Sequence, residues 1–417
     1  MRQLFALFIL IFSVSILNGQ QGMNKELTLD EAIEIGLKNN PRIISARENI
    51  SAAKGRFWSG ISLPAPEVGV SYEYTPVNKS LRNFSERTFE VSQSFEFPSN
   101  YFLRGSRFSK EEEIAFYRLK QTEVVIIAQI KSAYYNVLAK KELFRIAEEN
   151  RKIAEDFYRK SEIRYNVGEG TNLERLTAKV QFTEAKNNLE VASNELRTAF
   201  AELNFYLGYG KRTDEIFTLA DSLTYLPSDK FTFEELYNLS LSVNQQIKIS
   251  ELNVSIASIN KSLAWSSLLP NFNLGYFKQT RDGDNGFYGA SFGISVPLWF
   301  IFEQRGKIQE ATANLSISEY EVQLTKNEIA LKVKSAFTDY ENNLNQVKLY
   351  VNDILPQSEE IYRTAVKSYD TGEITYLEFL QAKQTLINAR SNYINVLLNY
   401  YLSIFTLEEI IGRSLTK

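Results

Sequence analysis

Two of the most reactive side-chain types, the thiol of cysteine and the imidazole of histidine, are missing from this sequence. The chain has 417 residues and contains no Cys and no His. Thiolate nucleophiles, imidazole bases and zinc sites built from thiolate or imidazole ligands are therefore excluded. Adjacent carboxylates such as Asp30 and Glu31, or Glu359 and Glu360, lie on helical patterns, where a solvated face is the usual explanation. We therefore expect no catalytic residue, no metal site and no cofactor, and an enzyme is the least expected class.

The most distinctive carboxylates belong to a motif that occurs twice. From Tyr165 to Lys179 and from Tyr369 to Lys383, nine of fifteen positions are identical. A glycine in each copy permits the left-handed backbone that ends a helix, and a threonine three residues later suits the N-cap of the next helix. The motif therefore predicts a helical reversal in each half of the chain. Its glycines, glutamates and threonines are Gly168, Glu169, Thr171 and Glu174 in the first copy and Gly372, Glu373, Thr375 and Glu378 in the second.

The repeat extends beyond this motif and organises the chain. Residues 27–41 match 231–245 at the same offset of 204, whereas Ile130 matches Val333 at an offset of 203. We expect a first structural repeat over 21–210, a connector over 211–230, a second repeat over 231–413 and a C-terminal tail over 414–417. Residues 1–20 place one Arg before a short apolar run, which predicts a secretory signal peptide and not a spanning helix.

Each repeat predicts the same order of elements. In the first, a helical pattern from Thr28 to about Leu63 precedes a β-hairpin over 68–97, a long helix over 104–165 and a helix over 171–208. In the second, a helix precedes a β-hairpin over 271–296, a long helix over 305–369 and a helix over 375–411. Prolines 98 and 297 end the two hairpins. The second long helix carries a seam with coiled-coil spacing: Phe337, Tyr340, Leu344, Val347, Val351 and Ile354.

The hairpin strands alternate aromatic or aliphatic residues with Gly, Ser, Asn and Glu, a pattern that fits lipid outside and water inside a transmembrane barrel. A soluble sandwich has the same alternation and is the alternative. Four strands cannot close in lipid, because unpaired edges are forbidden there and known barrels start at about eight strands. Three copies would give twelve strands and a water-filled lumen. A net charge of −3 supplies no basic face, so we expect no nucleic-acid partner.

Taken together, the layout and several motifs resemble TolC-type outer-membrane efflux proteins. The motifs are Leu-Thr-Leu-Asp-Glu-Ala-Ile at 27–33, Asn-Asn-Pro at 39–41, the strand-ending prolines and the doubled Tyr-x-x-Gly-Glu-x-Thr-x-Leu-Glu-x-Leu-x-Ala-Lys. The resemblance covers residues 27–413. It implies a mainly α fold with a β-barrel part: a homotrimer whose twelve-stranded barrel lies in outer-membrane lipid above a periplasmic coiled-coil tunnel. It also implies a periplasmic adaptor and an inner-membrane pump as partners.

A narrower resemblance concerns the stretch 273–300 and the following Gln-Arg-Gly-Lys-Ile-Gln at 304–309. These residues look most like the members that serve heavy-metal pumps of the resistance-nodulation-division (RND) class. With no His, no Cys and only two Met, the chain offers no soft-metal ligands, so metal selection would occur upstream.

The resemblance also implies roles for the doubled motif. Glu378 falls where the family places an acidic ring that narrows the tunnel entrance and favours cations. Relatives often carry a second acid three residues later, which is Gln381 here, and Glu174 is the equivalent of Glu378 in the first half. The alternative is that these carboxylates simply favour the positive end of a helix dipole.

The two turns correspond to surfaces that receive the adaptor's hairpin tips in the family. The residues concerned are Gly168, Glu169, Thr171, Gly372, Glu373 and Thr375. Relatives often have Val-Gly-Leu or Val-Gly-Thr at this point, whereas this chain has Val-Gly-Glu and Thr-Gly-Glu, so its contacts would differ in detail. A helical turn without a partner is the alternative.

The sequence as a whole favours a passive exit duct of a tripartite exporter. A duct for type I protein secretion fits the same pattern, because the pump and not the duct selects the cargo. A non-conducting periplasmic coiled-coil scaffold is a third hypothesis, and the Phe- and Tyr-rich strand faces argue against it.

Overall fold

The computed structural model describes residues 26–210, 217–225, 231–298 and 302–415. The predicted signal peptide over 1–20, and parts of the predicted connector and tail, lie outside the described residues. Two compact units are formed, and each draws on both sequence repeats. Unit 1 comprises the described parts of 1–40, 129–227 and 343–402, and unit 2 those of 41–128, 228–342 and 403–417.

The sequence repeats therefore do not coincide with compact units. The reason is the length of the helices, of which α4 (Pro98–Asn166) is the longest with 69 residues. At 1.5 Å per residue such a helix extends for roughly 100 Å, so its two ends cannot share one set of neighbours.

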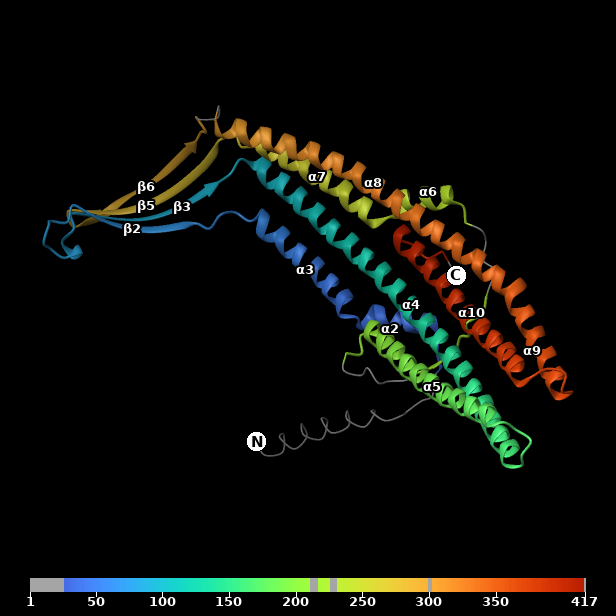
Figure 1. Ribbon diagram of the computed structural model, residues 1–417. Coiled ribbons are helices and arrows are strands. Elements are labelled where there is room, and N and C mark those ends of the chain that lie inside the picture. The colour runs from blue at the N-terminus through green and yellow to red at the C-terminus, as the bar shows by residue number, and fades with distance from the viewer. Residues whose placement is uncertain (1–25, 211–216, 226–230, 299–301, 416–417) are drawn as a thin grey trace, which may run out of the picture. The chain divides into compact units, whose positions relative to one another are not determined.

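Unit 2 contains a four-stranded antiparallel sheet in the order β2-β3-β5-β6 (Figure 1). Its strands are β2 (Glu67–Glu73), β3 (Glu86–Phe95), β5 (Asn271–Arg281) and β6 (Asp284–Ser295). Directly paired residues share a face, and the row Val68, Val91, Tyr276 and Ala290 is apolar across all four strands. Its members point to solvent in the isolated chain, as shown by Val68 with 64% and Tyr276 with 51% of its surface exposed.

The opposite face of the sheet is mostly polar or small. The row Gly69, Glu90, Phe277 and Gly289 contains one aromatic residue. A Cβ at Gly289 would lie 2.5 Å from the Phe277 ring, so that ring lies across the glycine. The strand pairing therefore confirms the alternation of apolar and polar residues predicted from the sequence. Phe277 is an exception, and its ring covers the backbone of Gly289.

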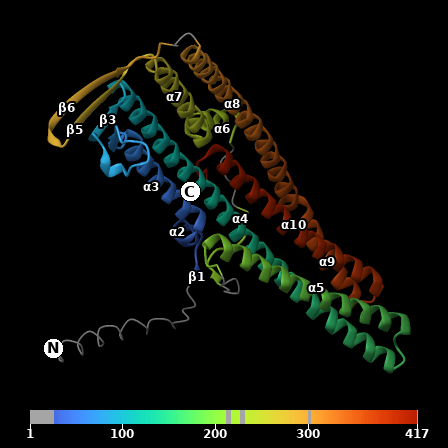
Figure 2. The same cartoon turned by 90° about the vertical axis from the view of Figure 1, so that its left-hand side faces the viewer.

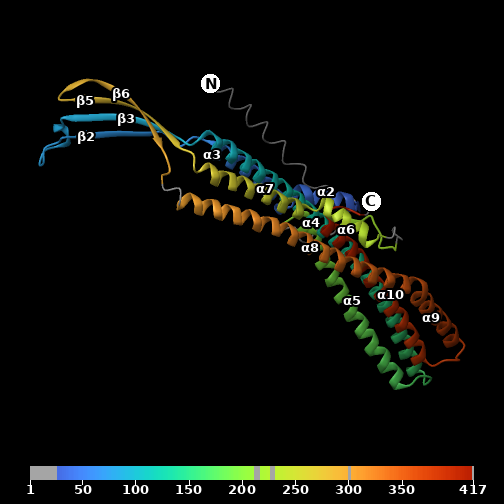
Figure 3. The same cartoon turned by 90° about the horizontal axis from the view of Figure 1, so that it is seen from above.

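The helices of unit 2 are α3 (Pro41–Ile61), α6 (Phe233–Val243), α7 (Gln245–Ser266), most of α8 (Glu303–Leu349) and the first part of α4. Ile114 of α4 packs with Ile249 and Leu252 of α7. Unit 1 contains α2 (Leu29–Asn39), the later part of α4, α5 (Asn172–Leu207), α9 (Leu355–Asp370) and most of α10 (Tyr376–Ile411). There α4 lies beside α5, and α9 beside α10 (Figures 1, 2 and 3).

A short parallel pair, β1 (Glu26–Leu27) with β4 (Thr218–Leu219), completes unit 1. The buried Tyr134 hydroxyl lies 2.8 Å from the carbonyl oxygen of Leu27 and 2.6 Å from Asp221 Oδ2. Burial, together with this carboxylate, raises the pKa of Tyr134. The phenol therefore stays protonated and ties the segment after α5 to the start of the chain.

The predicted helix from Thr28 to about Leu63 is wrong in one respect, because it is two helices. α2 ends before Asn40, and α3 begins at Pro41, whose ring lacks the N–H that an uninterrupted helix would need. The Asn40 side chain donates to the Tyr206 carbonyl oxygen at 2.9 Å. Its repeat equivalent, Asn244, makes the same bond at 2.7 Å to the Ile410 carbonyl oxygen, between α6 and α7. The boundary between the two helices is therefore stabilised by the same asparagine hydrogen bond in both halves of the chain.

The long helices differ from the prediction at two prolines. α4 begins at Pro98, six residues before the expected start at 104, because proline is well suited to the first position of a helix. The helix expected over 305–369 contains a π-helical turn, Tyr350–Ile354, whose Leu355 N–H bonds to the Tyr350 carbonyl oxygen. Pro356 follows at once, and the wider turn accommodates its ring and its missing N–H.

Before the π turn, three of the four residues of the predicted seam are buried and Leu344 is half-buried. Phe337, Tyr340 and Val347 have 7%, 1% and 0% of their surface exposed. Among the described residues, α10 alone is long and apolar enough to cross a membrane by length and composition, and 61% of its most apolar window is buried. That burial is typical of a core helix.

Candidate functional site

The first helical reversal joins α4 to α5. Gly168 has a φ of +83°, in the left-handed region. The N–H groups of Glu169 and Gly170 both donate to the Arg164 carbonyl oxygen, at 2.9 and 3.0 Å, and so satisfy the end of α4. The Thr171 side chain then accepts from the Glu174 N–H at 3.1 Å and caps α5.

The second reversal joins α9 to α10 by the same backbone geometry. Gly372 has a φ of +77°, and the N–H groups of Glu373 and Ile374 donate to the Ser368 carbonyl oxygen at 2.8 and 3.4 Å. A Cβ added at Gly168 or Gly372 would meet nothing within 4 Å. The two glycines are therefore required by backbone conformation and not by lack of space.

The carboxylates of the two turns have different partners. Glu378 accepts from the Thr375 N–H at 2.7 Å and from its hydroxyl at 2.8 Å. These bonds, the backbone one first, lower the pKa of Glu378, which stays ionised. Glu174 instead forms an ion pair with Arg164 at 3.4 Å, and Glu373 accepts from the Ser368 hydroxyl at 3.1 Å.

The remaining predicted site residues are exposed. Glu169 lies at the tip of the first turn, and Gln381 lies one helical turn after Glu378, on the same side of α10. Among the residues that the structure describes, no group of three or more acidic side chains could hold a metal ion. What the two tips offer is an exposed surface on turns whose backbone N–H groups are hydrogen-bonded.

An aromatic cluster beneath the second turn was not expected from the sequence. Phe157 of α4 stacks on Tyr376 with ring centroids 3.7 Å apart and contacts Phe379 at 6.2 Å, while Tyr369 packs on Phe379 at 5.1 Å. Burial raises the pKa of Tyr376. Of these rings on α9 and α10, only Tyr369 occupies a position that both copies of the doubled motif share. Phe157 carried no such signal, since it belongs to the other half of the chain.

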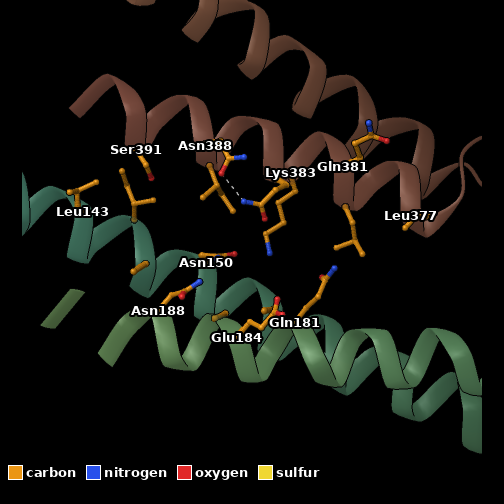
Figure 4. A pocket seen from close by; sticks show the side chains of 17 residues that line it. Leu143, Asn150, Gln181, Glu184, Asn188, Leu377, Gln381, Lys383, Asn388 and Ser391 are labelled. Carbon is orange, nitrogen blue, oxygen red and sulfur yellow. Dashed lines mark hydrogen bonds between the residues drawn. The ribbon is translucent and has the colours of Figure 1, made fainter. Parts of the chain in front are cut away.

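A cavity of about 680 Å³ opens further along unit 1, between α4, α5 and α10 (Figure 4). Polar side chains dominate its labelled lining, among them Asn150 of α4, Gln181 and Glu184 of α5, and Gln381 and Lys383 of α10. Lys383, the last residue of the doubled motif, is buried there with 7% of its surface exposed. Its position was also missed, because burial depends on α4 and α5.

The family described as "Outer membrane efflux protein" matches this chain twice, over residues 32–209 and 236–413. The match follows the two repeats and covers most of the chain, so the chain belongs to that family. As a member, it is an outer-membrane efflux channel of Gram-negative type, with a helical part that extends into the periplasm.

Relatives and solved structures agree with the family over nearly the whole length. The cobalt-zinc-cadmium resistance protein CzcC of Cupriavidus metallidurans is 22% identical over 93% of this chain and 90% of its own. The outer membrane protein TolC of Vibrio cholerae is 22% identical over 90% and 88%. The outer-membrane channel OprN has the same fold, with a TM-score of 0.76 at 17% identity over 92% of this chain and 89% of its own. The solved structure of CusC has a TM-score of 0.71 at 17% identity, over 96% of this chain and 96% of its own.

Proposed function

We propose that three copies of this chain form one exit duct, each contributing β2, β3, β5 and β6 to a twelve-stranded barrel. The exposed apolar face of the sheet supports the proposal, because such a face suits lipid and is costly in water. The outer strands β2 and β6 each pair on one side within the described residues. A sheet in lipid must close, so these edges would pair with the next copy.

The helices of unit 1 would form the periplasmic entrance of the duct. In this proposal three copies of Glu378 produce a negative potential at a constriction, with Gln381 one turn further and Glu174 in a supporting position. The hydrogen bonds from Thr375, which lower the pKa of Glu378, support the proposal because they favour an ionised carboxylate at this position.

The two turns would be the docking surface for a periplasmic adaptor, beneath which an inner-membrane pump supplies the cargo. The exposed residues Gly168, Glu169, Thr171, Gly372, Glu373 and Thr375 would form this surface. The hydrogen-bonded backbone of both turns supports the assignment, since a docking surface with a defined conformation loses little entropy on binding.

We infer an RND-type pump and heavy-metal cations as the cargo. The relative CzcC, named for resistance to cobalt, zinc and cadmium, is the observation that carries this inference. The duct itself would be passive toward the metal, because its side chains include no thiolate or imidazole to select soft metals.

The native mass of protein extracted in detergent from separated outer membranes tests the assembly. A trimer is expected. A monomer, or recovery in the soluble periplasmic fraction, would overturn the shared barrel.

The entrance is tested by single-channel ion selectivity in planar bilayers. Glu378→Gln should reduce the preference for cations, whereas Glu174→Gln, at the equivalent place in the first half, should change it less. An unchanged cation preference in Glu378→Gln would remove the acidic ring from the proposal.

A further inference from the structure

Lys383 carries a charge for which the described part of the chain provides no ion-pair partner. Its side chain is 93% buried, yet no carboxylate among the described residues forms an ion pair with it. Burial lowers the pKa of Lys383 to about 8. A buried and unpaired ammonium is strongly unfavourable, so such a group is normally paired or neutral.

Three carboxylates line the cavities around Lys383, and none of them forms an ion pair with it. On one side Glu149 of α4 and Glu359 of α9 both pair with Arg390, at 3.9 and 3.3 Å. On the other side Glu184 of α5 is exposed at the cavity wall and forms no ion pair with Lys383. The Lys383 ammonium therefore faces the cavity without an ion-pair partner among the described residues.

The cavity presents hydrogen-bond donors next to this ammonium. Figure 4 shows the Lys383 side chain extending from α10 toward α4 and α5, where Asn150, Gln181 and the carboxylate of Glu184 line the cavity. Carboxamide N–H groups and an ammonium are the donors that an anionic oxygen accepts from. A volume of about 680 Å³ admits a phosphate or a carboxylate group together with water.

We propose that the cavity between α4, α5 and α10 is an anion-binding site, in which Lys383 pairs with a phosphate or carboxylate group and the amides of Asn150 and Gln181 complete its coordination. The anion is either a free solute or a carboxylate of a second copy of this chain. The site goes beyond the proposed duct function and does not depend on it.

The sequence repeat supplies a matched control. Lys179 is the equivalent of Lys383 in the first half, 204 residues earlier, and its side chain is exposed. Lys383→Met and Lys179→Met remove the same charge from the same motif, while Lys383→Arg keeps the charge in the cavity.

The experiment compares thermal unfolding of the full-length protein in detergent, with inorganic phosphate or with chloride at matched ionic strength. Phosphate also stabilises proteins generally through exclusion from their surface, and that effect should be equal in all variants. A bound phosphate should add a further shift of about 2 °C in the wild type, in Lys179→Met and in Lys383→Arg, and none in Lys383→Met.

A second measurement distinguishes the source of the anion. If phosphate gives no specific shift, but Lys383→Met alone lowers the temperature at which the copies dissociate, the anion is a carboxylate of a second copy. If Lys383→Met and Lys179→Met match the wild type both in phosphate response and in dissociation temperature, the proposal is overturned.

Discussion

The two helical reversals have the same backbone and different surroundings. At each turn a glycine with positive φ precedes a threonine cap, and two N–H groups converge on one carbonyl oxygen. At the first turn, Arg175 Cζ lies 4.8 Å from the centroid of the Tyr165 ring. Tyr165 has 39% of its surface exposed. At the second turn Phe379 replaces this arginine, and its ring packs on Tyr369.

The difference shows which properties a repeated motif can specify. Residues that act on their own backbone, such as the glycines and threonines, behave alike in both halves because their partners lie within a few positions. Residues that act through distant elements diverge, as Lys179 and Lys383 do. The predictions below separate these two groups, beginning with the largest expected effect.

Replacing Phe157 by Ala should be the most destabilising change at the reversals. The ring packs against Tyr376 and Phe379, and its loss should cost about 3 kcal/mol, measured as a lower midpoint of thermal or denaturant unfolding. The repeat equivalent Ile361 is 50% exposed, so Ile361→Ala should cost well under that, about 0.5 kcal/mol. Equal losses would mean that the aromatic cluster does not distinguish the halves.

Gly168→Ala and Gly372→Ala should destabilise the protein equally, by about 1 kcal/mol each, because both force an L-residue into the left-handed region. Gly55 in α3 is the control. Its added Cβ also meets nothing within 4 Å, but its backbone is helical, so Gly55→Ala should be neutral or stabilising. Unequal costs at the two turns would show that the turns are not locally determined.

Loss of the threonine caps should have a smaller effect. Thr171→Ala and Thr375→Ala should each cost about 0.5 to 1 kcal/mol, as other N-caps do. Thr375 should be at the upper end, because its hydroxyl both accepts from the Glu378 N–H and donates to the Glu378 carboxylate. Serine at either position should restore most of the unfolding temperature. A failure of serine to rescue would point to the methyl group and not to the cap.

The pH dependence of Glu378 should be the smallest effect. Hydrogen bonds from Thr375 lower its pKa below the ordinary 4.5, so its stabilisation is complete above that value and is lost as pH falls through the folded-state pKa. Glu378→Gln should flatten the acid limb of a plot of unfolding temperature against pH. Glu235 has a lowered pKa from an equivalent box with Thr232, and Glu235→Gln should act likewise. An unchanged acid limb in Glu378→Gln alone would show that its cap is not formed.

Much of the fold could be predicted from the sequence, because it depends on local periodicity. The alternation of Val68, Val70 and Tyr72 gave the sheet face, and the doubled motif gave both reversals to within a residue or two. The errors lie at prolines. Pro41 divides an expected helix in two, and Pro98 begins a helix. Whether a proline begins, ends or interrupts a helix depends on the contacts around it, which the sequence does not show.

The candidate site was less predictable, since its distinguishing features come from pairs of distant residues. The capping roles of Thr171 and Thr375 followed from spacing alone. The stacking of Phe157 on Tyr376 and the burial of Lys383 against α4 required knowledge of which helices lie together.

The π-helical turn at Tyr350–Ile354 also explains an irregularity in the repeat itself. The two halves match at an offset of 203 at Ile130 and Val333, and at 204 at Tyr165 and Tyr369. The second half is therefore one residue longer than the first between these points. A π turn holds one residue more than the α-helical turn it replaces, so it absorbs a one-residue insertion while the helix on either side keeps its contacts. The π turn therefore accounts, within the second half, for the one-residue change in the offset between the two halves.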